Sequence, residues 1–209
     1  NCIVGIDLAH GAGNIQPNLH DSNVDFAAWC TYKYLNSGPG SLAGLFVHEK
    51  HAKNKDLPRF AGWWNHNKAT RFNMRQPFDV MEGAEGWQLS NPPILSMAAI
   101  KASLDLFDEV GMDALREKSV KLTGYFEFLI NEIDSEGITI ITPTNPKERG
   151  CQISIQVKNA DKNLHKKLTA QHVITDWREP DVIRCAPVPL YTSFEEVYQM
   201  TSILKSLLE

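Results

Sequence analysis

One lysine near the start of the chain, Lys33, stands where a reactive amine would be useful. It follows the apolar residues 26–30, Phe-Ala-Ala-Trp-Cys, and precedes a loop that contains Gly38, Pro39 and Gly40. An apolar run bounded by turn residues predicts a buried strand, and a lysine is seldom buried unless it is paired or used chemically. A partly desolvated amine has a lowered pKa and is a candidate Schiff-base nucleophile. The simpler alternative is a lysine that projects into water from the strand end.

A carboxylate and an imidazole follow a second apolar run at the start of the chain. Residues 1–7, Asn-Cys-Ile-Val-Gly-Ile-Asp, end in Asp7, and His10 follows three residues later. In open α/β sheets, ligands bind at the carboxyl ends of the strands. An acid facing a lysine suits pyridoxal 5'-phosphate, because the lysine holds the aldehyde and the acid keeps the ring nitrogen protonated as an electron sink. We therefore predict a pyridoxal-phosphate site that includes Asp7 and Lys33.

The elements that must position these residues belong to the α/β class. Residues 1–48 predict three strands joined by loops, the third at Leu42–Val47, with no helix between them. Residues 48–56 are charged and predict one or two helical turns. Residues 57–90 lack a clear periodicity and are rich in aromatic side chains, so we expect them to cover the active site or to reach a partner subunit.

Helices and a small domain are predicted for the rest of the chain. Asn91 followed by two prolines is typical of a helix start, and Gly111 ends that helix. A second helix is predicted at Asp113–Ile133. The following segments alternate in the manner of a small α+β domain. The predicted strands are residues 138–142, 151–157, 173–175 and 182–186, and the predicted helices are residues 163–171 and 194–208.

The composition narrows the classes of partner. Of the 209 residues 43% are hydrophobic, which is enough for a packed core, and the net charge of -4 gives no reason to expect nucleic acid or an anionic membrane as a partner. No apolar run approaches the roughly 20 residues that span a bilayer. The four cysteines show no paired spacing, so we expect reduced thiols rather than disulfides or metal ligands, in a cytoplasmic protein.

A set of motifs occurs in one order along essentially all of the chain. The motifs are Asp7-Leu-Ala-His10, Trp29-Cys-Thr-Tyr32-Lys33-Tyr-Leu-Asn, Trp63, Arg71-Phe-Asn-Met, Ser90-Asn91-Pro-Pro-Ile-Leu and Arg184-Cys-Ala-Pro-Val-Pro-Leu-Tyr. Together they resemble kynureninase, a pyridoxal-phosphate enzyme of the aspartate-aminotransferase fold, called fold type I. The resemblance implies hydrolysis of L-kynurenine, or 3-hydroxykynurenine, to anthranilate, or 3-hydroxyanthranilate, and L-alanine. That reaction belongs to tryptophan catabolism and NAD biosynthesis.

The resemblance also implies roles for four residues near the two strand ends. Lys33 would carry the cofactor as a Schiff base and form a catalytic pair with Tyr32, which would also donate to the cofactor phosphate. Asp7 would lie beside the pyridine nitrogen and His10 beside the ring. From the residues alone, Asp7 could be a solvated acid and His10 an ordinary turn histidine. Tyr32 could equally be a strand-end aromatic.

Three residues farther along the chain receive roles from the same resemblance. Trp63 and Asn91 would contact the cofactor or the substrate, in part from the other subunit of a homodimer. From composition alone, Trp63 could equally be an aromatic side chain packed in the hydrophobic core. The capping role of Asn91 is compatible with ligand binding, since a helix N-terminus attracts anions. Arg184 would hold the substrate α-carboxylate with two parallel hydrogen bonds, and a surface arginine is the alternative.

The resemblance covers only the second half of the family's chain. Residues 1–92 correspond to the end of the cofactor-binding large domain, residues 93–133 to connecting helices and residues 134–209 to the small C-terminal α+β domain. The family's first half supplies a phosphate-binding turn and an aromatic residue that stacks on the ring. The chain also starts inside a strand pattern without a Met. We therefore expect a fragment that is inactive alone.

Two alternatives compete with this interpretation. The first is another fold-type I pyridoxal-phosphate enzyme, such as a lyase, a cysteine desulfurase or an aminotransferase. Desulfurases carry a mobile catalytic cysteine, and we expect none of the four cysteines to lie in an exposed, flexible loop. The second alternative is a non-catalytic fragment that only dimerises or binds partners.

Overall fold

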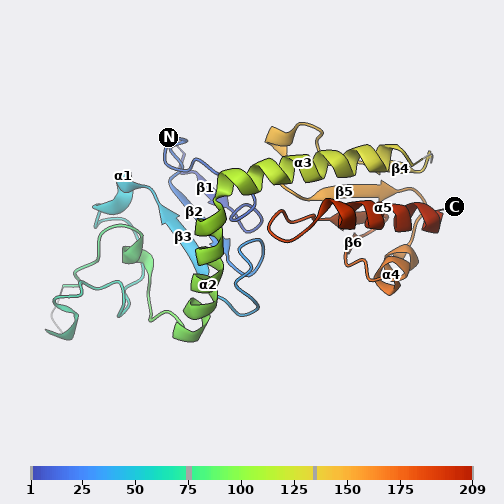
Figure 1. Cartoon of the computed structure of the whole chain (residues 1–209). Coiled ribbons are helices and arrows are strands. Elements are labelled where there is room, and N and C mark those ends of the chain that lie inside the picture. Colours follow the sequence, from blue (N-terminus) through green and yellow to red (C-terminus); the bar gives the residue numbers. More distant parts are fainter. Residues whose placement is uncertain (1, 74–76, 134–135, 209) are drawn as a thin grey trace. The chain divides into compact units, whose positions relative to one another are not determined.

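The computed structural model describes residues 2–73, 77–133 and 136–208 (Figure 1). The chain forms two compact units, Asn1–Glu109 and Val110–Glu209. The division falls where helix α2 (Ile94–Val110) gives way to helix α3 (Met112–Asn131). Gly111 separates the helices with a φ of 80°, a conformation that glycine adopts without steric cost, so the predicted helix end is confirmed.

The first unit contains a three-stranded sheet. Its strands are β1 (Gly5–Asp7), β2 (Phe26–Cys30) and β3 (Ala43–Val47), in the order β1-β2-β3. β1 runs parallel to β2, with Asp7 opposite Ala28, and β3 runs antiparallel to β2. All three strands were predicted; β2 has the predicted bounds, whereas β1 and β3 begin later than expected. The parallel pairing brings the carboxyl ends of β1 and β2 to the same edge of the sheet.

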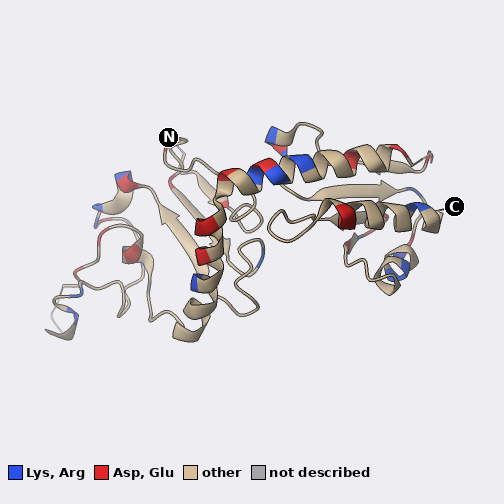
Figure 2. Cartoon of the chain, viewed as in Figure 1, with Lys and Arg blue, Asp and Glu red and all other residues tan. Residues whose placement is uncertain are grey.

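One face of this sheet is exposed, so the prediction of buried strands is only half right. Side chains alternate between the faces of a strand. Ala27 is fully buried, whereas Phe26 is 46% exposed and Leu45, from β3, is 42% exposed. β2 and β3 contain no charged residue, and both appear without charge colours in Figure 2. The exposed face therefore has the composition of a buried one.

Short helices and loops complete the first unit. Helix α1 (Glu49–Ala52) begins where Nδ1 of His48 accepts a hydrogen bond from the amide of Lys50. The irregular segment that follows holds two short 3-10 helices, η1 (Arg71–Asn73) and η2 (Ala84–Trp87). α2 starts at Ile94, where the carbonyl of Pro93 accepts the amide of Met97, so the expected start at the two prolines is slightly early.

The second unit packs helices on one face of a four-stranded sheet, in which each paired strand is antiparallel to its neighbour. The sheet order is β4-β5-β7-β6, and Figure 1 shows α3 and α5 running along it. Its core combines side chains of β5 and β7 with Leu122 and Phe126 of α3 and Leu204 of α5. The elements are β4 (Ile138–Ile140), η3 (Pro146–Glu148), β5 (Ile153–Val157), α4 (Lys162–Ala170), β6 (Asp176–Arg178), β7 (Val182–Cys185) and α5 (Phe194–Leu208).

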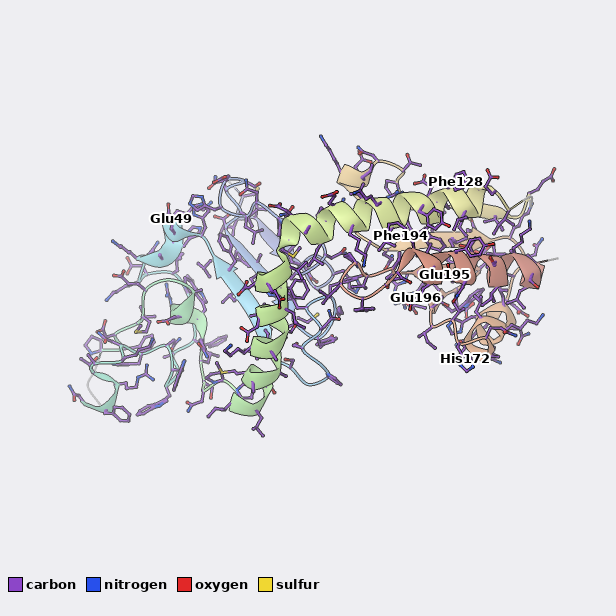
Figure 3. The ribbon with its side chains drawn as sticks, viewed as in Figure 1. Glu49, Phe128, His172, Phe194, Glu195 and Glu196 are labelled. Carbon is purple, nitrogen blue, oxygen red and sulfur yellow. The ribbon has the colours of Figure 1, made fainter. Side chains whose placement is uncertain are left out.

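One predicted strand of this unit is wrong. Residues 173–175 are not in a strand, and β6 begins after them at Asp176. His172, labelled in Figure 3, has a φ of 64° and donates its amide to the carbonyl of Thr169. The amide of Val173 reaches back to the carbonyl of Leu168. These two bonds form a Schellman motif that ends α4, so Val173 belongs to the helix cap.

Among the helices in the described ranges, none combines the length and the apolar composition needed to cross a membrane.

Candidate functional site

Asp7 ends β1 and begins a tight loop. Its Oδ1 accepts the amide of Ala9 at 2.8 Å, while the amide of Leu8 still pairs with Ala28 of β2 at 2.9 Å. The amides of Gly11 and Ala12 then turn back to the carbonyl of Leu8. Asp7 is exposed, and among the described residues its Oδ2 has no hydrogen-bond donor. One carboxylate oxygen is thus fixed by the loop and the other remains available to a ligand.

Lys33 lies on a loop that is held in place by buried residues on either side of it. Thr31, Leu35 and Ser37 are buried, and the hydroxyl of Ser37 donates to that of Thr31 at 2.7 Å. The carbonyl of Leu35 accepts the hydroxyl of Ser103 from α2. The amide of Ser37 bonds to the carbonyl of Thr31, which closes the loop. The loop tip around Lys33 is therefore held by a rigid base.

The Lys33 side chain is only partly exposed and makes no ion pair in the part of the chain that the structure describes. Its Nζ lies 5.7 Å from the centroid of the Tyr32 ring. Tyr32 itself is exposed. A lysine without a carboxylate partner differs from an ordinary surface lysine in a salt bridge, and its amine is available for chemistry.

The loops after β1 and β2 pack directly on each other. Gly13 has a φ of 77°, and a Cβ added there would lie 3.0 Å from the backbone of Tyr34. The ring of His10 meets the ring of Tyr34 edge-on at 6.1 Å. Cys30 Sγ contacts the carbonyl of Ala9 at 3.5 Å. These contacts bring the segments of Asp7, His10, Tyr32 and Lys33 together at one edge of the sheet, as the strand-end argument predicted.

An open hollow of about 570 Å³ lies on the exposed face of the same sheet. Asp7, Phe26 and Ala28 project on this face, because paired residues of neighbouring strands share a face. Cys30 also lines the hollow, which the sequence did not indicate. The lining residues are Ile3, Gly5, Ile6, Asp7, Ala9, Phe26, Ala28, Trp29, Cys30 and Ala43. The candidate acid therefore stands on the wall of an apolar, ligand-sized space.

Trp63 and Asn91 belong to a different part of the first unit. The Trp63 ring packs edge-on against Phe72 at 5.0 Å and is partly exposed. The amide of the next residue, Trp64, donates to the carbonyl of Leu89, which lies two residues before Asn91 in the sequence. Asn91 is exposed, and within the described ranges its side chain makes no capping hydrogen bond to α2, which begins three residues later. Among the described residues, no hydrogen bond or ring contact joins Trp63 or Asn91 to Lys33 or Asp7, so their ligand roles remain predictions.

A second hollow lies in the irregular segment. It has a volume of about 440 Å³ and is lined by Pro58, Arg59, Phe60, Trp87 and Leu89. The Arg59 guanidinium lies 4.0 Å from the centroid of the Trp87 ring and donates to the carbonyl of Asn54. These contacts tie together residues 54, 59 and 87 of a region without long helices or strands, as cation–π and hydrogen-bond contacts can do.

Arg184 lies in the second unit, on β7, and is largely buried on its sheet face. Its Nε donates to Oδ2 of Asp176 at 2.9 Å, and its Nη2 donates to the same oxygen. The simple surface interpretation of Arg184 is therefore incomplete, since the guanidinium is held by an acid. Sequence reasoning missed Asp176. The signal was available in the alternation of Asp176-Trp-Arg178 and Val182-Ile-Arg184-Cys, which places the polar side chains of β6 and β7 on one face.

The cysteines differ in exposure. Cys151 and Cys185 are buried, and burial raises the pKa of the Cys185 thiol to about 12. Cys30 is partly exposed. Cys2 is exposed and lies ahead of β1, outside any strand, whereas we expected no cysteine in an exposed, flexible loop. Among the described residues no cluster of His, Cys, Asp and Glu is suited to a metal ion.

Comparison with families and relatives identifies what the chain is similar to. Residues 115–204 match the family described as the kynureninase C-terminal domain. The chain is 55% identical over 204 residues to a kynureninase of Myxococcus xanthus, covering 98% of this chain and 48% of that protein. It is 57% identical over 205 residues to a kynureninase of Flavobacterium johnsoniae, covering 97% and 48%. The resemblance to the C-terminal half of kynureninase is confirmed, and the chain spans about half the length of these relatives.

Solved structures share the fold. A cysteine desulfurase of Escherichia coli matches with a TM-score of 0.78 and 13% identity, over 99% of this chain and 51% of that one. An alanine–glyoxylate aminotransferase of Nostoc sp. matches with a TM-score of 0.67 and 17% identity, over 100% and 54%. The predicted fold class, the end of a fold-type I large domain followed by a small α+β domain, is confirmed. At these identities the likeness concerns the fold alone.

Proposed function

We propose that this chain is the C-terminal half of a kynureninase, a pyridoxal-phosphate-dependent hydrolase that cleaves a carbon–carbon bond of L-kynurenine or its 3-hydroxy form. The products are anthranilate, or 3-hydroxyanthranilate, and L-alanine. The observation that carries the proposal is the position of Asp7 at the carboxyl end of β1 and of Lys33 in the loop after the parallel strand β2, in a chain 52–57% identical to kynureninases. Both supports are needed, because the fold alone serves several reactions.

The residues at the strand ends fit pyridoxal 5'-phosphate. An amine without an ion-pair partner among the described residues suits an aldehyde, and a carboxylate with one available oxygen suits a protonated ring nitrogen. The hollow beside Asp7 is apolar and of the size of a small-molecule site. When bound, the cofactor supplies an aldehyde for the substrate amine and a ring that accepts electrons.

The chain's own residues would then bind the cofactor and the substrate and transfer protons. Lys33 Nζ would hold the cofactor. Once released from it, the same amine would take the substrate α proton, because a general base must lie within hydrogen-bonding reach of the proton that it removes. Asp7 would hold a proton on the pyridine nitrogen. Tyr32 would donate to the cofactor phosphate and hand a proton to the substrate. Arg184 would bind the substrate α-carboxylate.

The remaining assignments rest on the resemblance. His10 would support Asp7 beside the ring, and Trp63 and Asn91 would contact ligand, in part across a homodimer whose active site lies at the subunit interface. Residues 1–92, 93–133 and 134–209 would be the end of the large domain, the connecting helices and the small domain. We also propose a cytoplasmic location for the complete enzyme.

The second candidate is a cysteine desulfurase, since such enzymes are among the structural neighbours and Cys2 is exposed. The identity of 52–57% to kynureninases, against 13–18% to the desulfurase structures, favours kynureninase. A non-catalytic fragment is also compatible with the chain by itself. The presence of an amine, a carboxylate and a guanidinium of the kinds that the proposed reaction needs, at Lys33, Asp7 and Arg184, favours the catalytic interpretation for the complete polypeptide.

The test replaces Lys33 in the complete polypeptide that contains these residues. With pyridoxal phosphate added, borohydride should attach the cofactor irreversibly to the wild-type protein at Lys33. Lys33→Ala should lose that attachment, and turnover of kynurenine should fall on the order of 10³-fold or more, since the variant lacks both the attachment point and the base.

Lys53→Ala is the matched control, because Lys53 is an exposed lysine at the end of α1 that makes no ion pair among the described residues. It should keep both attachment and turnover. Borohydride attachment that persists in Lys33→Ala and maps to another lysine would refute the assignment.

A further inference from the structure

The substrate-binding candidate Arg184 stands in a row of polar side chains across the sheet of the second unit. In the strand register, Ser154 of β5 is opposite Arg184 of β7, and Arg184 is opposite Asp176 of β6. The neighbouring residues Ile183 and Trp177 point into the core. The three polar residues therefore share the face that the helices do not cover, and they are direct cross-strand neighbours.

Asp176 holds one edge of the Arg184 guanidinium. Oδ2 of Asp176 accepts Nε at 2.9 Å and also accepts Nη2. Among the described residues Nη1 has no hydrogen-bond partner, and the side chain is 23% exposed. A guanidinium has five N–H groups in a fixed planar fork. Asp176 thus occupies the edge of the guanidinium formed by Nε and Nη2. The outer edge, which includes the N–H groups of Nη1, is left for a second carboxylate.

A second arginine also lies beside the Asp176 carboxylate. Nη2 of Arg178 lies 3.0 Å from the same Oδ2. Partial burial alone would raise the pKa of the Asp176 carboxyl, but the hydrogen bond and charge of Arg184, with the charge of Arg178, outweigh it and hold the pKa below its ordinary value. Asp176 is therefore ionised at neutral pH, and two arginines share one carboxylate.

We propose that Asp176 is a positioning residue, which fixes the orientation of Arg184 so that its outer edge receives the α-carboxylate of the amino-acid substrate. The inference rests on the proposed function, since it needs a substrate with an α-carboxylate. An arginine side chain has several rotatable bonds, and holding it in place in advance spares the substrate that ordering cost. Arg178, which is more exposed, shares Asp176 but lies at the outer strand end and is not required.

The experiment uses the complete enzyme loaded with cofactor and compares two substrates, L-kynurenine and its α-carboxamide. Asp176→Asn and Asp176→Ala should raise KM for kynurenine about 5- to 20-fold with kcat within about twofold. The KM for the carboxamide, which has no carboxylate for Arg184, should be the same in wild type and in both variants. Arg184→Ala should abolish the preference for kynurenine over the carboxamide. Arg178→Ala, the matched control, should leave KM for kynurenine within about twofold of wild type.

Several outcomes would overturn the proposal. An unchanged KM for kynurenine in both Asp176 variants would show that Arg184 needs no positioning. Equal rises in KM for both substrates, or a fall in kcat together with a lowered melting temperature, would show a merely structural role. If Asp176→Ala fails to fold, the isosteric Asp176→Asn decides. A wild-type enzyme that cleaves neither substrate would instead refute the proposed function, and the role of Asp176 with it.

Discussion

Asp7 uses one carboxylate oxygen to stabilise its own loop and leaves the other available to a ligand. The amide of Ala9 fixes Oδ1, and no donor among the described residues reaches Oδ2. The backbone of the loop also stays paired to β2 through the amide of Leu8. An acid oriented by its own loop can hold a proton on a ligand nitrogen without first reorganising, which is the usual advantage of a preorganised site.

Replacing Asp7 tests this role. Asp7→Asn keeps the shape and can still accept the Ala9 amide, but it cannot stabilise a positive charge on the ring nitrogen. Loss of a charge-assisted hydrogen bond, about 1.5–3 kcal/mol, predicts a kcat that is about 10- to 100-fold lower in the complete enzyme. Steady-state kinetics with kynurenine measures it. Asp56→Asn, a change at an exposed acid outside the site, should have no effect, and near-normal turnover of Asp7→Asn would place the acid partner elsewhere.

At the scale of elements, Asp25 joins three segments at the amino end of β2, away from the strand end that carries Lys33. It accepts the amide of Val4 at 2.7 Å, Nζ of Lys50 at 2.7 Å and Nε2 of His51 at 2.6 Å. The Lys50 ammonium, the Val4 amide and the His51 ring hold the pKa of the Asp25 carboxyl well below its ordinary value of 3.8, against the effect of burial. Figure 3 labels Glu49 on the α1 helix that is anchored in this way.

Asp25 therefore makes stability depend on pH in a defined direction. Its folded pKa lies below the unfolded value, so the stabilisation is complete above the unfolded value and is lost as the pH falls through 3.8 toward the folded value. Asp25→Asn should lower the melting temperature of the complete enzyme by a few degrees at pH 7, and the difference from wild type should shrink below pH 3.8. Thermal unfolding between pH 7 and pH 3 measures it. Asp108→Asn, on the exposed surface of α2, should match wild type, and a difference that grows toward acid would contradict the assignment.

Elements with local signals were predictable from the sequence. The helix at residues 194–208 is confirmed at both ends. The Ser193 hydroxyl accepts the amide of Glu196, and the Glu196 carboxylate accepts the amide of Ser193, which is a capping box. Glu196 and its neighbours Phe194 and Glu195 are labelled at this helix start in Figure 3. The predicted strand at residues 173–175 failed because a histidine took the left-handed cap position usually given to glycine, which periodicity does not reveal.

The site residues, too, were predictable only where the sequence signal is local. The strand-end positions of Asp7 and Lys33 follow from apolar runs and turn residues, which are local features of the sequence. The partner of Arg184 depends on which strands become neighbours and in which register. Asp176 and Arg184 meet only because β6 pairs with β7, a contact between segments that the local pattern does not specify.

At the scale of the whole molecule, apolar surface remains uncovered in the first unit. Ile94 is 80% exposed and Leu95 is 89% exposed at the start of α2, and the sheet face of Phe26 and Leu45 is also open. Contiguous apolar surface normally marks an interaction site or a tendency to associate. The proposed first half of the enzyme would cover such surface. We therefore expect the 209 residues alone to associate and to lack turnover.

The rate of anthranilate release decides whether these residues are one half of a kynureninase. The complete polypeptide and the 209-residue chain are each given pyridoxal phosphate and L-kynurenine, with 3-hydroxykynurenine as the second substrate. We expect release of the aryl acid and L-alanine in equal amounts by the complete polypeptide, and no release by the 209-residue chain. A complete polypeptide that releases no aryl acid from either substrate would contradict the claim, as would full turnover by the 209 residues alone.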